Sequence, residues 1–229
     1  MIKKLLQSII ELPFPQVCVC CGNSINIKKE YICYLCKMKR FESANDEDLI
    51  ILPDKIAFQF AMWRFDKGGY LQLLLHKLKY DYLKDVGEQM GKMVGEKLLN
   101  SHYVEVIDSF GFEPIIVPVP LHPSKKRKRG YNQARSIGVG LAEKTGWELI
   151  GNDVVKRIRK TTTQTGLDSN QRTKNLEKAF SIINDQILMN RFPIIVDDVF
   201  TTGATTFELA DELIKDTDLK AGIVTIAIA

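Results

Sequence analysis

The chain has 229 residues, of which 45% are hydrophobic and 26% are charged, as in a globular protein with one sizeable core. No apolar run approaches the ~18 residues that a membrane-spanning helix needs, so we expect a cytoplasmic protein without a membrane partner. The net charge is only +4, but residues 122–160 hold eleven Lys/Arg and three Asp/Glu, a net +8 in this segment and −4 elsewhere. This asymmetry indicates a basic surface for an anionic partner, although a well-solvated loop would also be basic.

The first residues have the spacing of a short amphipathic helix that ends before Pro13, with an apolar face of Leu5, Leu6, Ile9 and Ile10. Polar residues interrupt this run and no small-residue cleavage site follows it, which argues against a signal peptide.

All five cysteines lie between residues 18 and 36, and four of them form two CxxC pairs: Cys18, Cys21, Cys33 and Cys36. Four thiolates presented by two such turns are the ligand set of structural zinc sites, which leave no coordination position open for catalysis. Cys20 breaks the spacing and is not expected to be a ligand. The alternatives are a disulfide framework or buried free thiols, and a cytoplasmic location disfavours disulfides. We therefore predict a zinc-binding module in residues 1–45.

A second domain is predicted over residues 46–229, after an acidic linker at about residues 41–54. It begins with a strand at 56–62 and helices at 69–80 and 85–101. From residue 114 strands alternate with helices. The strands are expected at 114–120, 154–158, 192–196 and 221–229, and the helices at 131–146, 170–180 and 204–215, with a basic loop after the first strand. This alternation predicts an α/β fold with a mostly parallel sheet covered on both faces.

Two glycines, Gly138 and Gly140, lie inside the helical pattern of 131–146 rather than between a strand and a helix. A dinucleotide-binding loop is therefore not indicated. Gly146 is expected to end this helix.

The segment PIIVDDVFTTGATT, residues 193–206, places Asp197 and Asp198 at the carboxyl end of a strand, where open α/β sheets bind ligands. Adjacent carboxylates repel each other unless hydroxyls, a metal or a base neutralise them. The threonines and the glycine that follow open a helix, whose backbone amides form a phosphate cradle. Sugar hydroxyls on the acids and a phosphate in the loop describe a ribose 5-phosphate. The alternative is an ordinary strand–turn–helix with capping threonines. The GK of a Walker-type loop is absent.

This segment resembles the fingerprint of the type I phosphoribosyltransferases. The resemblance implies that Asp197 and Asp198 face the ribose hydroxyls of phosphoribosyl pyrophosphate, bound together with Mg²⁺. It also implies that a loop wraps the 5-phosphate, formed by Thr201, Thr202, Gly203, Ala204 and Thr205.

The rest of the chain resembles the ComF family, phosphoribosyltransferase-like proteins associated with bacterial competence for DNA uptake. The motifs that carry this resemblance follow in order: the paired CxxC, LKY at 78–80, VPVPLHP at 117–123, RGYNQA at 129–134, and Gln164, Leu167, Arg172 and Asn175. The resemblance implies a type I phosphoribosyltransferase-like fold with a small N-terminal four-cysteine zinc module. It further implies a pyrophosphate loop at 118–125, including Ser124 and Lys125, and a mobile loop at 159–170.

Two functions from different classes follow. The first is a competence protein that has a phosphoribosyl pyrophosphate site, acts in DNA uptake, binds single-stranded DNA and works with other competence proteins. Its DNA-binding cations would be Lys125, Lys126, Arg127, Lys128 and Arg129. Tyr131 could stack on a base or lie in the core. The alternative function is a Mg²⁺-dependent phosphoribosyltransferase with an unidentified nitrogen acceptor.

Overall fold

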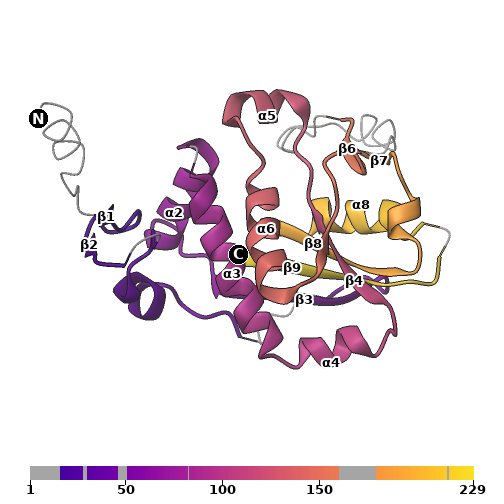
Figure 1. Cartoon of the computed structure of the whole chain (residues 1–229), viewed down its shortest axis with the longest axis horizontal. Helices are drawn as coiled ribbons and strands as arrows, with labels where there is room; N and C mark the ends of the chain where they lie inside the picture. The colour runs from indigo at the N-terminus through magenta and orange to yellow at the C-terminus, as the bar shows by residue number, and fades with distance from the viewer. Residues whose placement is uncertain (1–15, 28–29, 46–50, 82, 160–178, 216) are drawn as a thin grey trace, which may run out of the picture.

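The computed structural model describes residues 16–27, 30–45, 51–81, 83–159, 179–215 and 217–229 (Figure 1). These residues form an α/β fold around a five-stranded sheet. All its strands are parallel, in the spatial order β3 (Ile56–Arg64), β9 (Ala221–Ile228), β8 (Arg191–Phe200), β4 (Glu113–Pro118) and β5 (Glu148–Leu149). The prediction of a mostly parallel sheet is confirmed. The more specific expectation, a type I phosphoribosyltransferase-like arrangement, stays a prediction.

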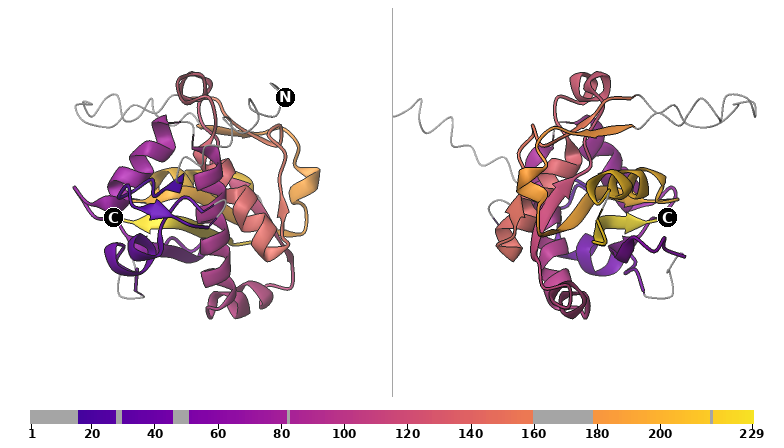
Figure 2. Two further views of the ribbon diagram at one scale, coloured as in Figure 1. Left: turned by 60° about the vertical axis from the view of Figure 1, so that its left-hand side comes forward. Right: turned by 90° about the vertical axis from the view of Figure 1, so that its right-hand side faces the viewer.

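Helices cover both faces of this sheet (Figures 1 and 2). On one face, Ile194 and Val196 of β8 share a core with α2 (Tyr70–Tyr80), α3 (Lys84–Leu99) and α6 (Gln133–Thr145). On the other face, Ile195 packs with Leu209 of α8 (Ala204–Leu213). A helix α4 (Tyr103–Asp108), which the sequence did not indicate, packs beside β3 through Tyr103, whose ring lies 5.0 Å from that of Phe58.

One of the two glycines of the 131–146 pattern, Gly140, has a packing role that it shares with Gly91 of α3. A Cβ atom at Gly140 of α6 would overlap the carbonyl oxygen of Glu88 in α3, and one at Gly91 of α3 would overlap the carbonyl oxygen of Ile137. The backbones of α3 and α6 therefore touch, which only glycine allows. Gly146 ends α6 in the left-handed conformation, with φ 76°, as predicted.

Three expectations about secondary structure are wrong. The basic segment is not a loop but a short helix, α5 (Pro123–Arg129), which has proline in its first turn, His122 as N-cap and Gly130 as left-handed C-cap. The strand expected at 154–158 is β6 (Val155–Arg157), which does not join the central sheet but pairs antiparallel with β7 (Phe180–Ile182). Phe180, expected at the end of a helix, begins β7. In addition, β8 is longer than the strand expected at 192–196, because it runs through the acidic pair to Phe200.

Other expectations fall wholly or partly outside the described residues: the N-terminal helix, the centre of the 41–54 linker (46–50), the 159–170 loop beyond Arg159, and the 170–180 helix up to residue 178. The domain boundary near residue 45 stays a prediction. Of the helices that the structure describes, none combines the length and the apolarity needed to cross a membrane.

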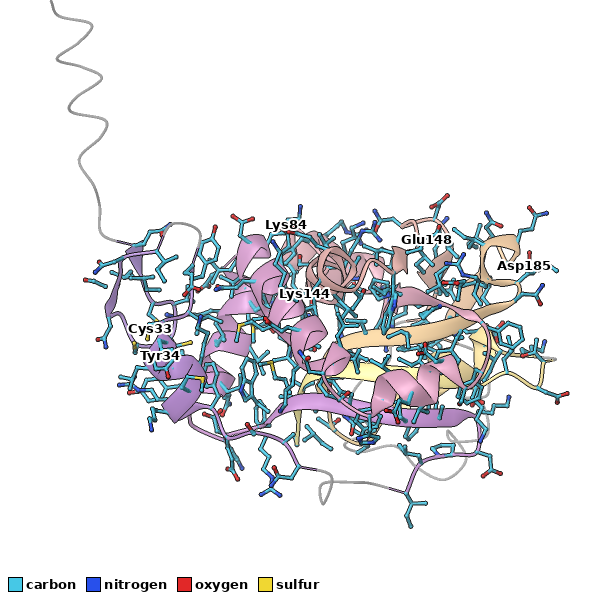
Figure 3. All side chains as sticks on the ribbon, turned by 60° about the horizontal axis from the view of Figure 1, so that its bottom comes forward. Cys33, Tyr34, Lys84, Lys144, Glu148 and Asp185 are labelled. Carbon is cyan, nitrogen blue, oxygen red and sulfur yellow. The ribbon has the colours of Figure 1, made fainter. Side chains whose placement is uncertain are left out.

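The cysteine segment holds two short strands, β1 (Gln16–Val17) and β2 (Ser24–Ile25), and one turn of π-helix, η1 (Cys36–Arg40). A 3₁₀ turn, η3 (Gln186–Leu188), precedes β8. Figure 3 shows Cys33 and Tyr34 at one end of the molecule and Asp185 at the other, so the cysteine segment lies far from the β7–β8 connection.

Candidate functional site

The acidic pair lies near the carboxyl end of β8, where Asp197 pairs in register with Thr225 of β9. Side chains alternate between the two faces of a strand. Ile195 belongs to the core under α8 and Val196 to the core under α2 and α3, so Asp197 follows the α8 face and Asp198 the α2 face. The two acids therefore meet different surroundings, which adjacency in the sequence does not reveal.

Asp197 and the threonine-rich loop line one hollow. Its wall consists of Asp197, Val199 and the whole of residues 200–206. Three of the five loop residues singled out in the sequence, Thr201, Thr202 and Ala204, are exposed. The hydroxyl oxygen of Thr202 accepts a hydrogen bond of 3.4 Å from the amide of Ala204, at the start of α8. The structure thus brings the predicted sugar-binding acid and the predicted phosphate loop together.

Gly203 makes this loop possible. It has φ 72° and serves as the N-cap of α8, a backbone conformation that side chains with a Cβ atom rarely adopt. A Cβ atom there would overlap the ring of Phe207 and lie 2.8 Å from Phe200 Cζ.

Asp198 has a partner that sequence reasoning missed. Its Oδ2 atom lies 2.5 Å from Nζ of Lys79, at the end of α2, and the carboxylate side chain is only 8% exposed. Lys79 is the middle residue of the LKY motif, which contributes to the family resemblance but does not by itself give the lysine a role. The cation that neutralises the acidic pair therefore comes from more than a hundred residues earlier in the chain.

Burial raises the pKa of Asp197 well above its ordinary value, and the neighbouring charge of Asp198 raises it further. Asp197 also accepts a hydrogen bond of 2.8 Å from the amide of Asp198, which acts in the opposite direction.

The basic segment reaches the same edge of the sheet. β4 lies beside β8, and just after β4 the amide of Val119 donates to the carbonyl of Val196 at 2.9 Å. The chain therefore leaves β4 next to the acidic pair, and α5 begins four residues after Val119. Ser124 Oγ lies 2.8 Å from Nδ1 of His122, and Ser124 and Lys125 are half-buried. Lys126, Arg127 and Lys128 are exposed, while Arg129 is half-buried.

Two tyrosines connect α5 to the end of α2. The ring of Tyr80 lies beneath Lys128 and Arg129, 5.8 Å and 5.5 Å from the cations. The hydroxyl of Tyr131 donates to the carbonyl of Leu78. Burial raises the pKa of Tyr131 to about 12, so this hydroxyl stays protonated and remains a donor at neutral pH. Of the two roles considered for Tyr131, the structure favours the internal one.

A further cation near the acids is Arg157 in β6. It is buried, and its guanidinium lies 5.2 Å from the ring centroid of Phe180. Burial lowers its pKa, and the charges of Glu208 and Asp197 oppose that change. Arg157 therefore does not contribute to an exposed basic surface.

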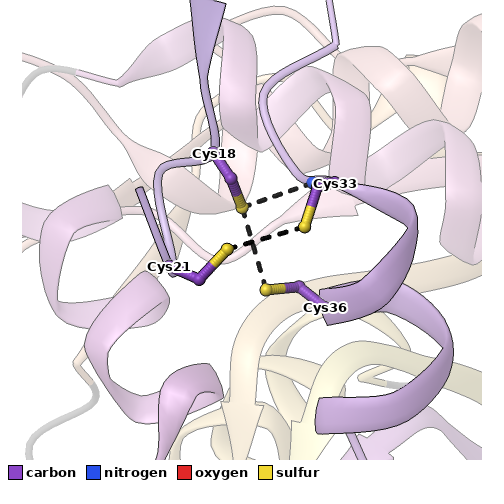
Figure 4. Close-up of side chains that lie close together, drawn as sticks. All are labelled: Cys18, Cys21, Cys33 and Cys36. Carbon is purple, nitrogen blue, oxygen red and sulfur yellow. Dashed lines mark hydrogen bonds between the residues drawn. The ribbon is translucent and has the colours of Figure 1, made fainter. Parts of the chain in front are cut away.

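The four paired cysteines form a compact cluster, with all four sulfurs within 4.8 Å of one another (Figure 4). The Sγ atoms of Cys18 and Cys36 are 3.8 Å apart and those of Cys21 and Cys33 are 3.6 Å apart. All five cysteines are free thiols. Sulfurs around a tetrahedral metal with bonds of about 2.3 Å lie about 3.8 Å from one another. The cluster can hold a metal ion and is compatible with structural zinc.

The thiols of the cluster differ in acidity. Burial alone would raise the pKa of Cys18, but the backbone amides of Cys33, Cys21 and Cys20 outweigh it and lower the pKa to about 6. Burial raises the pKa of Cys36 and of Cys33. Burial also raises the pKa of Cys20, to about 12. Cys20 lies outside the cluster of four, as its spacing predicts.

No protein-family model matches the chain. Among curated proteins, competence protein F of Haemophilus influenzae is 41% identical over 106 residues, which is 44% of each chain. DNA utilization protein YhgH of Salmonella typhimurium is 30% identical over 151 residues, 64% of this chain and 62% of the relative. The protein of the same name from Escherichia coli K12 is 29% identical over 153 residues, 66% and 64% of the two chains. The matches span less than two thirds of the length of these relatives.

Proposed function

We propose that this chain is a ComF-family protein and that it acts in DNA uptake or use. We also propose that it binds phosphoribosyl pyrophosphate with Mg²⁺ at the carboxyl end of β8. The proposed role in DNA uptake rests on relatives named for competence and for DNA utilization, and the proposed ligand on the site. We further propose that the protein is cytoplasmic and that other competence proteins are its partners.

The observation that supports the proposed ligand is the hollow that Asp197 shares with residues 201–205. Carboxylates accept hydrogen bonds from the hydroxyls of a ribose, and Asp197 and Asp198 would bind this part of the ligand. Backbone amides at the N-terminus of α8 and the threonine hydroxyls would bind the 5-phosphate. Ser124 and Lys125, which follow the neighbouring strand β4, would meet the pyrophosphate together with the metal ion, which offsets its charge when bound.

Calorimetric titration of Mg²⁺-phosphoribosyl pyrophosphate tests this assignment. Hydrogen bonds to charged groups contribute about 1.5–3 kcal/mol, so Asp197→Asn should weaken binding about ten- to a hundredfold. The matched control is Asp211→Asn, on α8 but far along the helix, whose carboxylate is 65% exposed and pairs with Lys55 at the surface. Equal affinities for wild type and Asp197→Asn would place the ligand elsewhere or nowhere.

For the cysteine cluster we propose one structural zinc ion held by Cys18, Cys21, Cys33 and Cys36. The sulfur separations of 3.6 Å and 3.8 Å support it, as does the thiol of Cys18, which ionises readily because its pKa is lowered to about 6. With four protein ligands no coordination position remains for a substrate.

Single-stranded DNA is the second proposed ligand, bound on α5. This seven-residue helix presents five consecutive cations, Lys125 to Arg129, none of which is buried. Cations in such a row neutralise successive phosphates and release counterions, which gives affinity that depends little on base sequence.

A further inference from the structure

The Lys79–Asp198 pair differs from a surface ion pair. Its atoms are 2.5 Å apart, the carboxylate side chain is 8% exposed and the lysine side chain is 27% exposed. Surface pairs contribute little because water screens them, but removing one partner of a buried pair leaves an uncompensated charge. Without the ammonium of Lys79, the side chain of Asp198 would therefore lack an opposite charge inside the fold.

The backbone that carries Lys79 is held on both sides. The residue before it, Leu78, is fully buried and its carbonyl accepts the hydroxyl hydrogen bond of Tyr131. The residue after it, Tyr80, packs against His76, with the ring centroids 4.7 Å apart and the rings tilted by 43°, and it lies beneath the cations of α5. A lysine side chain is long and flexible, so anchoring the last turn of α2 reduces the positions that its ammonium can take.

We infer that Lys79 is a positioning residue of the proposed phosphoribosyl site, acting through Asp198. This inference rests on the proposed function. The ammonium of Lys79 holds Oδ2 of Asp198, which fixes the carboxylate at the end of β8 and leaves its second oxygen to accept a ribose hydroxyl. Asp197, on the other face of the strand, shares its hollow with the phosphate loop. One face of the β8 end thus supplies a lysine-held carboxylate, and the other a carboxylate beside the phosphate cradle.

The competing role for Lys79 is a direct contact with a phosphate group. The two roles differ in whether the effect of Lys79 passes through Asp198. A double-mutant cycle separates them, because a residue that acts only through another has no further effect once that other residue is changed.

The experiment is calorimetric titration of Mg²⁺-phosphoribosyl pyrophosphate into five proteins: the wild type, Lys79→Met, Lys79→Arg, Asp198→Asn, and the double variant Lys79→Met/Asp198→Asn. Lys79→Met should weaken binding about tenfold or more, as expected when one partner of a buried ion pair is removed. Lys79→Arg should restore most of the affinity, because it keeps the cation. The double variant should bind about as well as Asp198→Asn alone.

Lys84→Met is the matched control, since Lys84 begins the next helix and pairs with Glu88 at the surface, where its side chain is 62% exposed. Its affinity should equal that of the wild type. The double variant also protects the test against misfolding, because it removes both members of the buried Lys79–Asp198 pair.

Unchanged affinity of Lys79→Met would overturn the inference. So would equal losses in Lys79→Met and Lys79→Arg, or a further loss in the double variant, which would indicate direct phosphate contact. A folded wild type that does not bind the ligand at all would instead overturn the proposed function.

Discussion

At the scale of single residues, the turn between β8 and α8 depends on the backbone of Gly203. Gly68 has a similar conformation, with φ 81° against 72°, but nothing lies within 4 Å of the Cβ atom that it lacks. At Gly203 the same atom would overlap Phe207, whose ring packs on Phe200 at 5.7 Å. At Gly68 only the left-handed backbone requires glycine. At Gly203 the backbone requires it as well, and the aromatic rings of Phe207 and Phe200 leave no room for a Cβ atom.

We expect Gly203→Ala to lower the free energy of unfolding by about 2–5 kcal/mol, the sum of left-handed strain and overpacking. Gly68→Ala should lower it by only about 1–2 kcal/mol, because only the strain applies. Urea denaturation of both variants measures the difference. Equal losses would show that Phe207 moves aside without cost.

At the scale of elements, α3 and α6 pack with their backbones in contact. Gly140 and Gly91 form the closest points, and ion pairs flank them, including Lys92 with Glu143 at 2.6 Å. Such packing fixes the distance between the helices. It therefore also fixes α6, which follows α5 and Tyr131 along the chain.

Gly140→Ala should force these helices apart and cost about 1–3 kcal/mol of stability, as overpacking usually does. For a chain of this size that corresponds to a fall in Tm of about 2–4 °C for each kcal/mol. Gly138→Ala is the matched control, since its Cβ atom would lie 3.1 Å from the flexible tip of Leu149 and from Pro118. A Gly140→Ala variant as stable as Gly138→Ala would contradict the backbone contact.

The short helix α5 concentrates the charge of the basic segment on one element. We expect the triple variant Lys125→Gln, Lys126→Gln, Lys128→Gln to bind single-stranded DNA more weakly. The slope of its log–log salt dependence should flatten by about 0.7 for each DNA phosphate that the variant no longer neutralises. Fluorescence anisotropy at several salt concentrations measures both quantities.

The control for this test removes the same charge elsewhere. Lys55, Lys84 and Lys92 each pair with an acid at the surface, at 45–62% side-chain exposure, and glutamine at these positions should leave DNA binding nearly intact. If both triple variants behave alike, affinity follows net charge and α5 is not a specific site.

At the scale of the whole molecule, the cysteine segment is part of the main core. Ile32 and Cys36 belong to the same buried cluster as Leu71 and Leu74. Polar contacts add to this packing: Lys77 Nζ donates to the carbonyl of Val19 at 2.8 Å, and the amide of Tyr31 donates to Gln89 at 2.9 Å. Loss of a bound metal should therefore lower the stability of the main core as well as that of the cysteine segment.

We predict about one zinc ion per chain in protein purified without chelator, as a four-thiolate site binds. Cys33→Ser should lose the metal and unfold at a lower temperature, while Cys20→Ser should keep it. Elemental analysis and thermal melts measure these outcomes. Metal retained in both variants, or a melt insensitive to chelator, would contradict the assignment.

Local patterns in the sequence were sufficient to predict the features that neighbouring residues encode. The alternation of apolar strands with amphipathic helices predicts the parallel sheet, because parallel strands need crossover connections. The paired CxxC spacing predicts the cluster of four thiols, and it leaves out Cys20 correctly. The two acids and the threonine loop predict a ribose 5-phosphate site, and the structure places Asp197 and residues 201–205 around one hollow because they are neighbours in the chain. That this hollow binds the ligand stays a prediction.

The contacts between distant residues became visible only in the folded chain. Lys79 reaches Asp198 because α2 ends near the carboxyl end of β8, and no spacing in the sequence encodes that contact. The alternation of β8 gives the two adjacent acids different partners, which shows only once each face is packed. The antiparallel pair of β6 and β7 lies apart from the central sheet, although the sequence at 154–158 looks like that of the other strands. In each case the deciding interaction joins segments far apart in the chain, and its free energy depends on burial that only the folded state creates.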